Sequence, residues 1–193
     1  MSGDARPVRW SAPLIVLHWL AGALILELIA HGWTILHAGL SAATAFDLYQ
    51  SHKSIGFVVL ALTAARLVLR FSRKAPPKPA AAPWENGLAG IVQAALYGLT
   101  IAAIASGWLV VSTSPLPIPT RFFDLFVVPD IARPDAALFA AATLAHDVAV
   151  WSIAGLVALH VAGALKHHFV DRDDVLARML PRSGPRPPDA WPR

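Results

Sequence analysis

The sequence contains 193 residues, of which 56% are hydrophobic and only 15% are charged, and this composition is too apolar for a soluble domain of that length. The formal net charge of +4 does not indicate nucleic-acid binding, because most of the basic residues flank apolar runs, as they do in membrane proteins. The absence of cysteine excludes disulfides, iron–sulfur clusters and thiolate ligands, so histidine must supply most of the protein ligands of any metal centre.

Four apolar stretches are each long enough to cross a ~30 Å hydrocarbon core as an α-helix. In chain order they run from about Leu14 to Leu36, Leu48 to Phe71, Gly87 to Val111 and Ala137 to Lys166. The connector of residues 72–85 is basic and rich in proline, so we expect an extended loop at the membrane surface. Prolines also prevent a long helix in the loop of residues 112–137. We therefore predict an all-α fold, an integral membrane four-helix up-down bundle.

The distribution of Lys and Arg predicts the orientation of the chain. The segment before the first span has two of these residues, the connector of residues 72–85 with its flanks has five, and the tail with Lys166 has six. On the other side, the first link has none beyond Lys53, and the third loop has only Arg121 and Arg133. We therefore expect both termini to face the cytoplasm. Residues 1–180 would form one domain, the chain after Lys166 would be peripheral, and residues 181–193 would be a proline-rich cytoplasmic tail.

The fourth span contains two histidines, His146 and His160, which are fourteen residues apart. At ~100° per residue this spacing returns to within ~40° of the starting direction, so both imidazoles leave the same face of the helix. At ~1.5 Å per residue they are about 21 Å apart along the axis, one near each boundary of the hydrocarbon core. Ionisable side chains at such depths are usually functional, although interior histidines bonded to neighbouring helices would produce the same pattern.

The direction of each span predicts which histidines share a depth. His18 enters the membrane from the cytoplasmic side and His160 leaves toward that side, whereas His52 and His146 each begin a span from the outer side. Two imidazoles at each of two depths are suited to two haem irons with two axial ligands each, stacked across the bilayer. A zinc or iron site without porphyrin would instead bring three or four ligands to one depth.

Three neighbouring residues are consistent with haem binding. Gly22 follows His18 by four residues and Gly56 follows His52 by four, and a missing side chain one turn along lets a porphyrin lie against the helix. Glycine is also simply common in membrane helices. Arg66 repeats the fourteen-residue step from His52, so it should lie at the depth of the inner haem and reach a propionate. The alternative is an ordinary arginine that extends its charge to the membrane boundary.

Other polar residues near the spans have two interpretations each. Lys53 places a cation beside His52, where it either attracts a small anion or anchors the helix at the interface. Glu27 and His31 are separated by four residues and are therefore neighbours on one helical face. They form either a proton relay toward a quinone or a hydrogen-bonded structural pair. The remaining histidines are weaker candidates for a functional role: His37, His167 and His168.

Several short motifs occur in order between Arg9 and Arg182. They are His18-Trp19 at the start of the first span, HKSIG at His52 with RLVLR at the end of that span, His146-Asp147, LHVAGALKHHF around His160, and LARMLPR near the C-terminus. This ordered set resembles the bacterial cytochrome b561 family. The resemblance implies a four-helix cytochrome of the bacterial inner membrane with two haem b groups and with four axial ligands: His18, His52, His146 and His160.

The resemblance also implies a function. At least one characterised type in the family is a superoxide oxidase that passes the electron to ubiquinone, and other members are described only as electron carriers. We therefore expect a membrane oxidoreductase that moves single electrons between superoxide on the periplasmic side and the quinone pool, with Lys53 as the residue that meets superoxide. Glu27 is not part of the shared pattern. Two alternatives are a haem-bearing membrane anchor of a larger dehydrogenase complex and a histidine-lined metal or ion transporter.

Overall fold

The computed structural model of the chain describes residues 9–73, 75–77, 81–116 and 118–181. Four long helices account for most of them: α1 (Ala12–His37), α2 (Ala42–Ser72), α3 (Pro83–Thr113) and α4 (Ala136–Lys166). Each is long and apolar enough to cross a membrane, so the predicted four-helix membrane fold is confirmed. Large apolar side chains such as Leu36, Phe71 and Trp151 are exposed on the outside of the helices, as expected for surfaces that contact lipid.

The start of α2 is set by a local cap rather than by the apolar stretch alone. The helix begins at Ala42, earlier than the predicted Leu48, because Ser41 Oγ accepts a hydrogen bond from Thr44 N at 3.2 Å. The link from α1 is correspondingly short. Gly39 turns the chain within this link at a φ of +58°, a conformation that residues with a Cβ rarely adopt.

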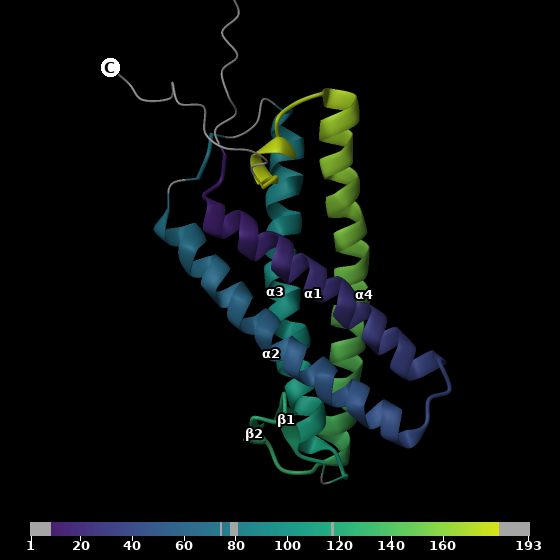
Figure 1. Cartoon of the computed structure of the whole chain (residues 1–193). Helices are drawn as coiled ribbons and strands as arrows, with labels where there is room; N and C mark the ends of the chain where they lie inside the picture. Colours follow the sequence, from purple (N-terminus) through teal and green to yellow (C-terminus); the bar gives the residue numbers. More distant parts are fainter. Residues whose placement is uncertain (1–8, 74, 78–80, 117, 182–193) are drawn as a thin grey trace, which may run out of the picture.

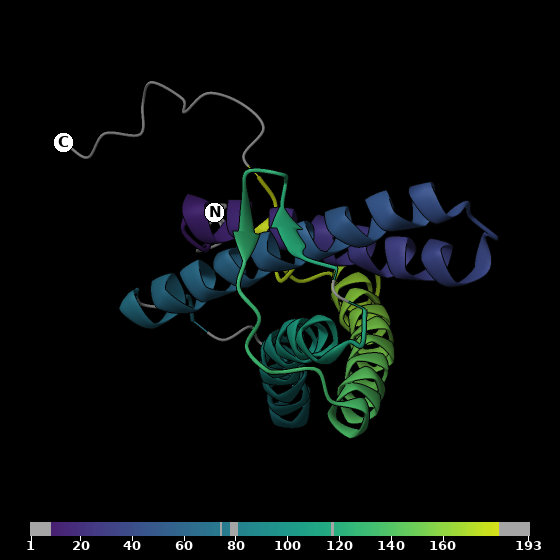
Figure 2. The ribbon, with the colours of Figure 1, turned by 90° about the horizontal axis from the view of Figure 1, so that it is seen from below.

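The four helices form two helical hairpins that cross each other. α1 lies beside α2 and α3 lies beside α4 in both views (Figures 1 and 2). In Figure 1 the α1–α2 pair runs obliquely across the α3–α4 pair, and Figure 2 shows α1 and α2 along their length while α3 and α4 are seen almost end-on. Within each hairpin the two helices are antiparallel neighbours, as predicted for successive spans, but the two hairpins are crossed rather than aligned. Ala103, Ala149 and Ile153 are buried between the pairs, against Ile25 and Ile29 of α1.

A small antiparallel sheet, which the all-α prediction did not include, interrupts the loop between α3 and α4. Strand β1 (Thr120–Phe122) pairs with β2 (Phe126–Val128), and Phe122 stacks on Phe126 with 5.1 Å between ring centroids. The turn residues Phe123 and Asp124 have φ values of 46° and 58°. Strands of three residues are too short to produce a recognisable alternation of apolar and polar residues, which is why the sequence did not reveal them.

Two side chains of α2 hold this β-hairpin in place. Gln50 Nε2 donates a hydrogen bond to Pro119 O at 2.9 Å, and Gln50 Oε1 accepts one from Arg121 N at 3.1 Å. Ser54 Oγ accepts a hydrogen bond from Phe123 N at 3.0 Å and donates one to Arg121 O at 2.9 Å. Ser54 belongs to the HKSIG motif, and Gln50 lies two residues before it. The β-hairpin is therefore bound to the part of α2 that contains His52 and Lys53.

The chain after α4 folds back onto the bundle, which corrects the prediction that it is peripheral. It contains a π-helix, η1 (His167–Asp171), and a short 3-10 helix, η2 (Ala177–Met179). Trp19 Nε1 of α1 donates a hydrogen bond to Met179 O at 2.7 Å, and Arg178 donates one to Pro77 O in the α2–α3 connector. Of the predicted tail of residues 181–193, all but the first residue lie outside the described residues.

Candidate functional site

Two pairs of histidines lie within the helix bundle, and α4 contributes one member to each pair. His18 on α1 lies next to His160 on α4, with 6.0 Å between the ring centroids and 79° between the ring planes. His52 on α2 lies next to His146 on α4, with 6.4 Å between the centroids and 72° between the planes. All four side chains are partly buried. The structure therefore brings together the same partners that the direction of the spans predicts.

The spacing within each pair is suited to one metal ion held from two sides. Two imidazoles that bind a metal through opposite nitrogen bonds of about 2.0 Å have ring centroids roughly 6 Å apart. Among the described residues, neither pair belongs to a group of three or more side chains that could hold a metal ion without further ligands. Haem brings four nitrogens of its own and needs only two axial ligands. The donor set of each pair therefore fits haem iron.

Helix α3 supplies no histidine, yet it sets the orientation of His146. The Nδ1 atom of that ring lies 2.8 Å from the carbonyl oxygen of Ala103, and a backbone carbonyl only accepts hydrogen bonds. This contact assigns the ring proton to Nδ1 and leaves Nε2 with the lone pair that a metal ligand needs. A Cβ on Gly107 would lie 3.1 Å from the same ring, so only glycine lets the imidazole occupy this position without a shift. Sequence reasoning missed both residues, because a small residue in an apolar span has no distinctive signal.

The glycines singled out in the sequence face open space. A Cβ built at Gly22 or at Gly56 meets no described atom within 4 Å. Each glycine lies one helical turn beyond a histidine of a pair, Gly22 beyond His18 and Gly56 beyond His52. A flat macrocycle requires space beside the helix, so the absence of contacts at these two positions is compatible with haem binding.

Two cations lie near the pairs, one at each end. The Arg66 guanidinium lies 5.1 Å from the centre of the Tyr97 ring and is close enough to His18 to interact with it electrostatically. Lys53 is partly buried, and the Asp130 carboxylate in the loop after the β-hairpin is close enough to interact with it electrostatically. A carboxylate close to Lys53 was not expected from the sequence, because the two residues are far apart along the chain.

The sequence matches known proteins over almost its whole length. The family model of prokaryotic cytochrome b561 matches residues 9–182. The chain belongs to this family. It is 30% identical over 184 residues to cytochrome b561 homolog 2 of Escherichia coli (strain K12), covering 95% of this chain and 97% of that relative. It is 28% identical over 182 residues to cytochrome b561 homolog 1 of the same strain, covering 90% and 98% respectively.

Membership of the cytochrome b561 family defines the general chemistry. The protein is a haem b cytochrome of a bacterial membrane, and its activity is transmembrane electron transfer. The resemblance seen in the motifs is therefore confirmed. Family membership favours haem binding over the alternative of a histidine-lined metal or ion transporter. The residues that could hold haem are the two imidazole pairs described above, and a Cβ at Gly22 or Gly56 would meet no described atom that fills the space beside them.

A third imidazole of this cytochrome, His31, lies close to the pair formed by His52 and His146. His31 Nε2 is 3.9 Å from Glu27 Oε1, so the predicted neighbours on α1 are indeed adjacent, although this distance is too long for a direct hydrogen bond. His31 is near enough to His52 to interact with it electrostatically. Its Nδ1 atom is buried and has no hydrogen-bond partner among the residues described. The sequence places Glu27 beside His31, but only the packing of α1 on α2 brings His31 to His52.

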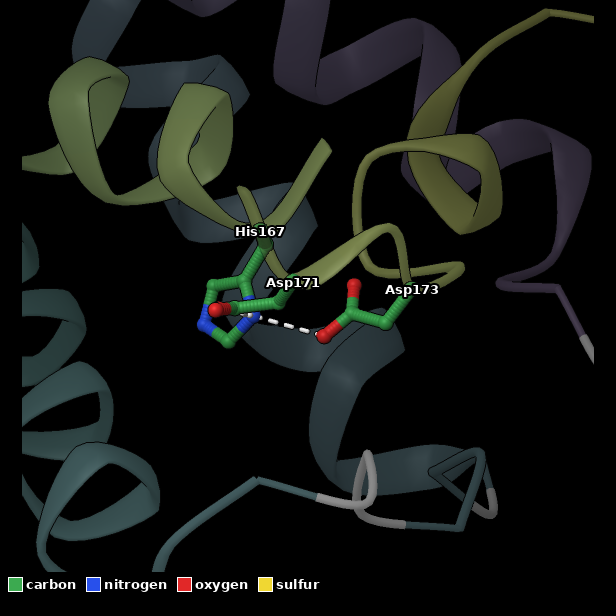
Figure 3. Close-up of side chains that lie close together, drawn as sticks. All are labelled: His167, Asp171 and Asp173. Carbon is green, nitrogen blue, oxygen red and sulfur yellow. Dashed lines mark hydrogen bonds and ion pairs between the residues drawn. The ribbon is translucent and has the colours of Figure 1, made fainter. Parts of the chain in front are cut away.

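Figure 3 shows a further group of ligand-type side chains, His167, Asp171 and Asp173, at the end of α4. His167 Nδ1 lies 2.7 Å from Asp173 Oδ2 and 3.3 Å from Asp171 Oδ2. Lys166 Nζ lies 2.7 Å from Asp171 Oδ2 and 2.7 Å from Glu85 Oε1 at the start of α3. These ion pairs fasten the π-helical turn to both helices. The sequence analysis missed this network, because the turn that gathers the carboxylates around His167 has no recognisable motif.

Proposed function

We propose that the protein is a di-haem oxidoreductase in which His18 and His160 bind the inner haem b and His52 and His146 bind the outer one. The spacing of the two imidazole pairs, 6.0 and 6.4 Å between ring centroids, is the observation that carries this proposal. When bound, haem supplies a reversible one-electron redox centre. Each pair of imidazoles would hold one haem, and haem held by two imidazoles would serve electron transfer rather than oxygen chemistry at the metal.

The positions of the pairs support a path from one side of the membrane to the other. His146 and His160 lie about 21 Å apart along α4 at ~1.5 Å per residue, which is most of the ~30 Å hydrocarbon core. The inner pair lies toward the helix ends that carry most of the Lys and Arg residues, so we assign it to the cytoplasmic side. Arg66 is near the inner pair and is suited to binding a haem propionate. All of these groups belong to one functional unit within residues 1–180.

For the outer side we propose superoxide as the electron donor and ubiquinone as the final acceptor. Superoxide is a small anion that loses one electron and leaves as dioxygen, and two such electrons with two protons convert ubiquinone into ubiquinol. Lys53 is adjacent to the ligand His52. Its positive charge favours the approach of an anion. Lys53 would thus act in substrate capture, while the imidazole pairs define the electron path.

The visible spectrum and haem content of the purified protein test this proposal. We expect two haem b groups per chain, reduction of both by superoxide, and reoxidation by a soluble ubiquinone analogue. One haem per chain would contradict the two-pair assignment. Two haems with no response to superoxide would retain the electron path and exclude superoxide as the donor.

A further inference from the structure

A cavity of about 270 Å³ lies between the C-terminal half of α2 and the N-terminal half of α3. None of the four paired histidines lines it, although its lining residue Tyr97 has the Arg66 guanidinium 5.1 Å from the centre of its ring. Leu67 and Phe71 form part of an apolar wall, whereas Arg70, Gln93 and Tyr97 supply polar groups. The cavity is close to the helix ends that border the α2–α3 connector, the level at which lipid headgroups are expected.

The cation in this cavity has no anionic partner among the residues that the structure describes. Arg70 Nη2 donates a hydrogen bond to Gln93 Oε1 at 3.4 Å, and the guanidinium lies 5.1 Å from the centre of the Trp10 ring. None of the ion pairs formed by the described residues includes Arg70 or its neighbour one turn earlier, Arg66. A guanidinium has five N–H donors, so most of those on Arg70 remain available for an anion.

The other polar groups of the cavity are also suited to an oxygen-rich anion. Tyr97 Oη is buried and has no hydrogen-bond partner in the part of the chain that the structure describes. Gln93 uses its carbonyl oxygen for Arg70, which leaves its amide N–H groups as donors. Arg70, Gln93 and Tyr97 therefore line one cavity, and none of the described residues that line it carries a carboxylate. A phosphate, which offers several strong acceptor oxygens, would satisfy the donors of Arg70 and Gln93 together.

We infer that this cavity binds the phosphate of an anionic phospholipid, with the acyl chains lying along Leu67 and Phe71. A headgroup with its own ammonium would place that cation next to the Arg70 guanidinium in the wall of the cavity, so a net negative headgroup is favoured. Basic pockets between membrane helices on the cytoplasmic side are suited to such lipids. The inference does not depend on the electron donor or on the number of haems.

Lipid binding can be measured on the purified, haem-loaded protein in an uncharged detergent. Phosphatidylglycerol is titrated against the protein, with phosphatidylcholine and inorganic phosphate in parallel, and the thermal unfolding temperature is recorded. We expect only phosphatidylglycerol to raise this temperature at low concentration. The Arg70→Gln variant should weaken its apparent affinity roughly ten- to a hundredfold, because a charge-assisted hydrogen-bond pair is lost. Tyr97→Phe, which removes one hydroxyl and keeps the ring, should have a smaller effect.

The Arg73→Gln variant is the matched control, because it removes the same charge from an exposed position at the end of α2 that does not line the cavity. It should retain the response to phosphatidylglycerol. An equal response in the Arg70→Gln variant would overturn the inference. So would an equal effect of phosphatidylcholine or inorganic phosphate, or displacement of phosphatidylglycerol by a ubiquinone analogue. A loss of haem from the Arg70→Gln protein would also overturn it, because Arg70 would then belong to the haem site.

Discussion

Gly107 on α3 is packed so closely against His146 on α4 that a Cβ at position 107 would lie 3.1 Å from both Cε1 and Nδ1 of the imidazole. The same Nδ1 atom is 2.8 Å from the Ala103 carbonyl oxygen, one turn earlier on α3. The helix without a histidine therefore determines the ring plane and the tautomer of a proposed ligand on its neighbour. This relationship makes α3 part of the site.

Replacing Gly107 with valine should weaken binding of the outer haem, because the added side chain displaces the His146 ring. Binding of the inner haem should be unchanged. Loss of groups that orient a metal-binding histidine typically weakens binding about 10- to 100-fold. Haem quantification and a redox titration would measure the effect on each haem. Gly98→Val on the same helix is the control, because a Cβ there meets no described atom within 4 Å. Two unaltered haems in the Gly107→Val protein would show that α3 does not orient the ligand.

The pairing of the histidines can be tested with four single alanine variants. Changing His18 or His160 should remove the same haem component, and changing His52 or His146 should remove the other. The physical reason is that a haem held by only one imidazole would be bound much more weakly than a haem held by two. His37→Ala is a suitable control, because His37 is exposed and stacks on Trp33 at 4.0 Å, outside both pairs. Loss of the same component from the His18 and His52 variants would contradict the assignment.

The orientation of the chain in the membrane can be determined with topology reporters. A reporter fused after Arg193 should be active as a cytoplasmic protein, and one inserted near Pro119 as a periplasmic protein, because the Lys and Arg residues are concentrated on the side of the termini. The opposite pattern would reverse the naming of the inner and outer haems. It would leave the pairing of the histidines unaffected.

Electrostatic capture of superoxide can be tested at Lys53. The Lys53→Glu variant should be reduced by superoxide more slowly than the original protein, while reduction from the quinol side and haem content remain unchanged. Because the screening length falls from ~10 Å at 0.1 M to ~3 Å at 1 M salt, the original protein should also slow as salt is added. Stopped-flow absorbance at several ionic strengths measures both effects.

The Asp130→Asn variant provides the opposite change, because its carboxylate lies near Lys53 and partly offsets that charge. It should accelerate reduction by superoxide at low salt. If neither variant changes the rate or its salt dependence, Lys53 serves as an interfacial anchor.

The sequence by itself determined the number of membrane-spanning helices and the partners among the histidines. Span length is a local property of apolar composition, and the direction of each span follows from the charges at its ends. Once these were known, His18 had to share a depth with His160, and His52 with His146. The same residues lie next to each other in the structure, at 6.0 and 6.4 Å between ring centroids.

Only the tertiary structure decided which residues support those histidines. Gly107 packs against the His146 ring, and His31 lies near His52. Gln50 and Ser54 form hydrogen bonds with the β-hairpin. All of these contacts arise because segments distant in the chain pack together at one specific register. Such contacts depend on how the two helical hairpins cross, and this crossing follows from the fit of buried side chains between helices rather than from any periodic pattern along one helix.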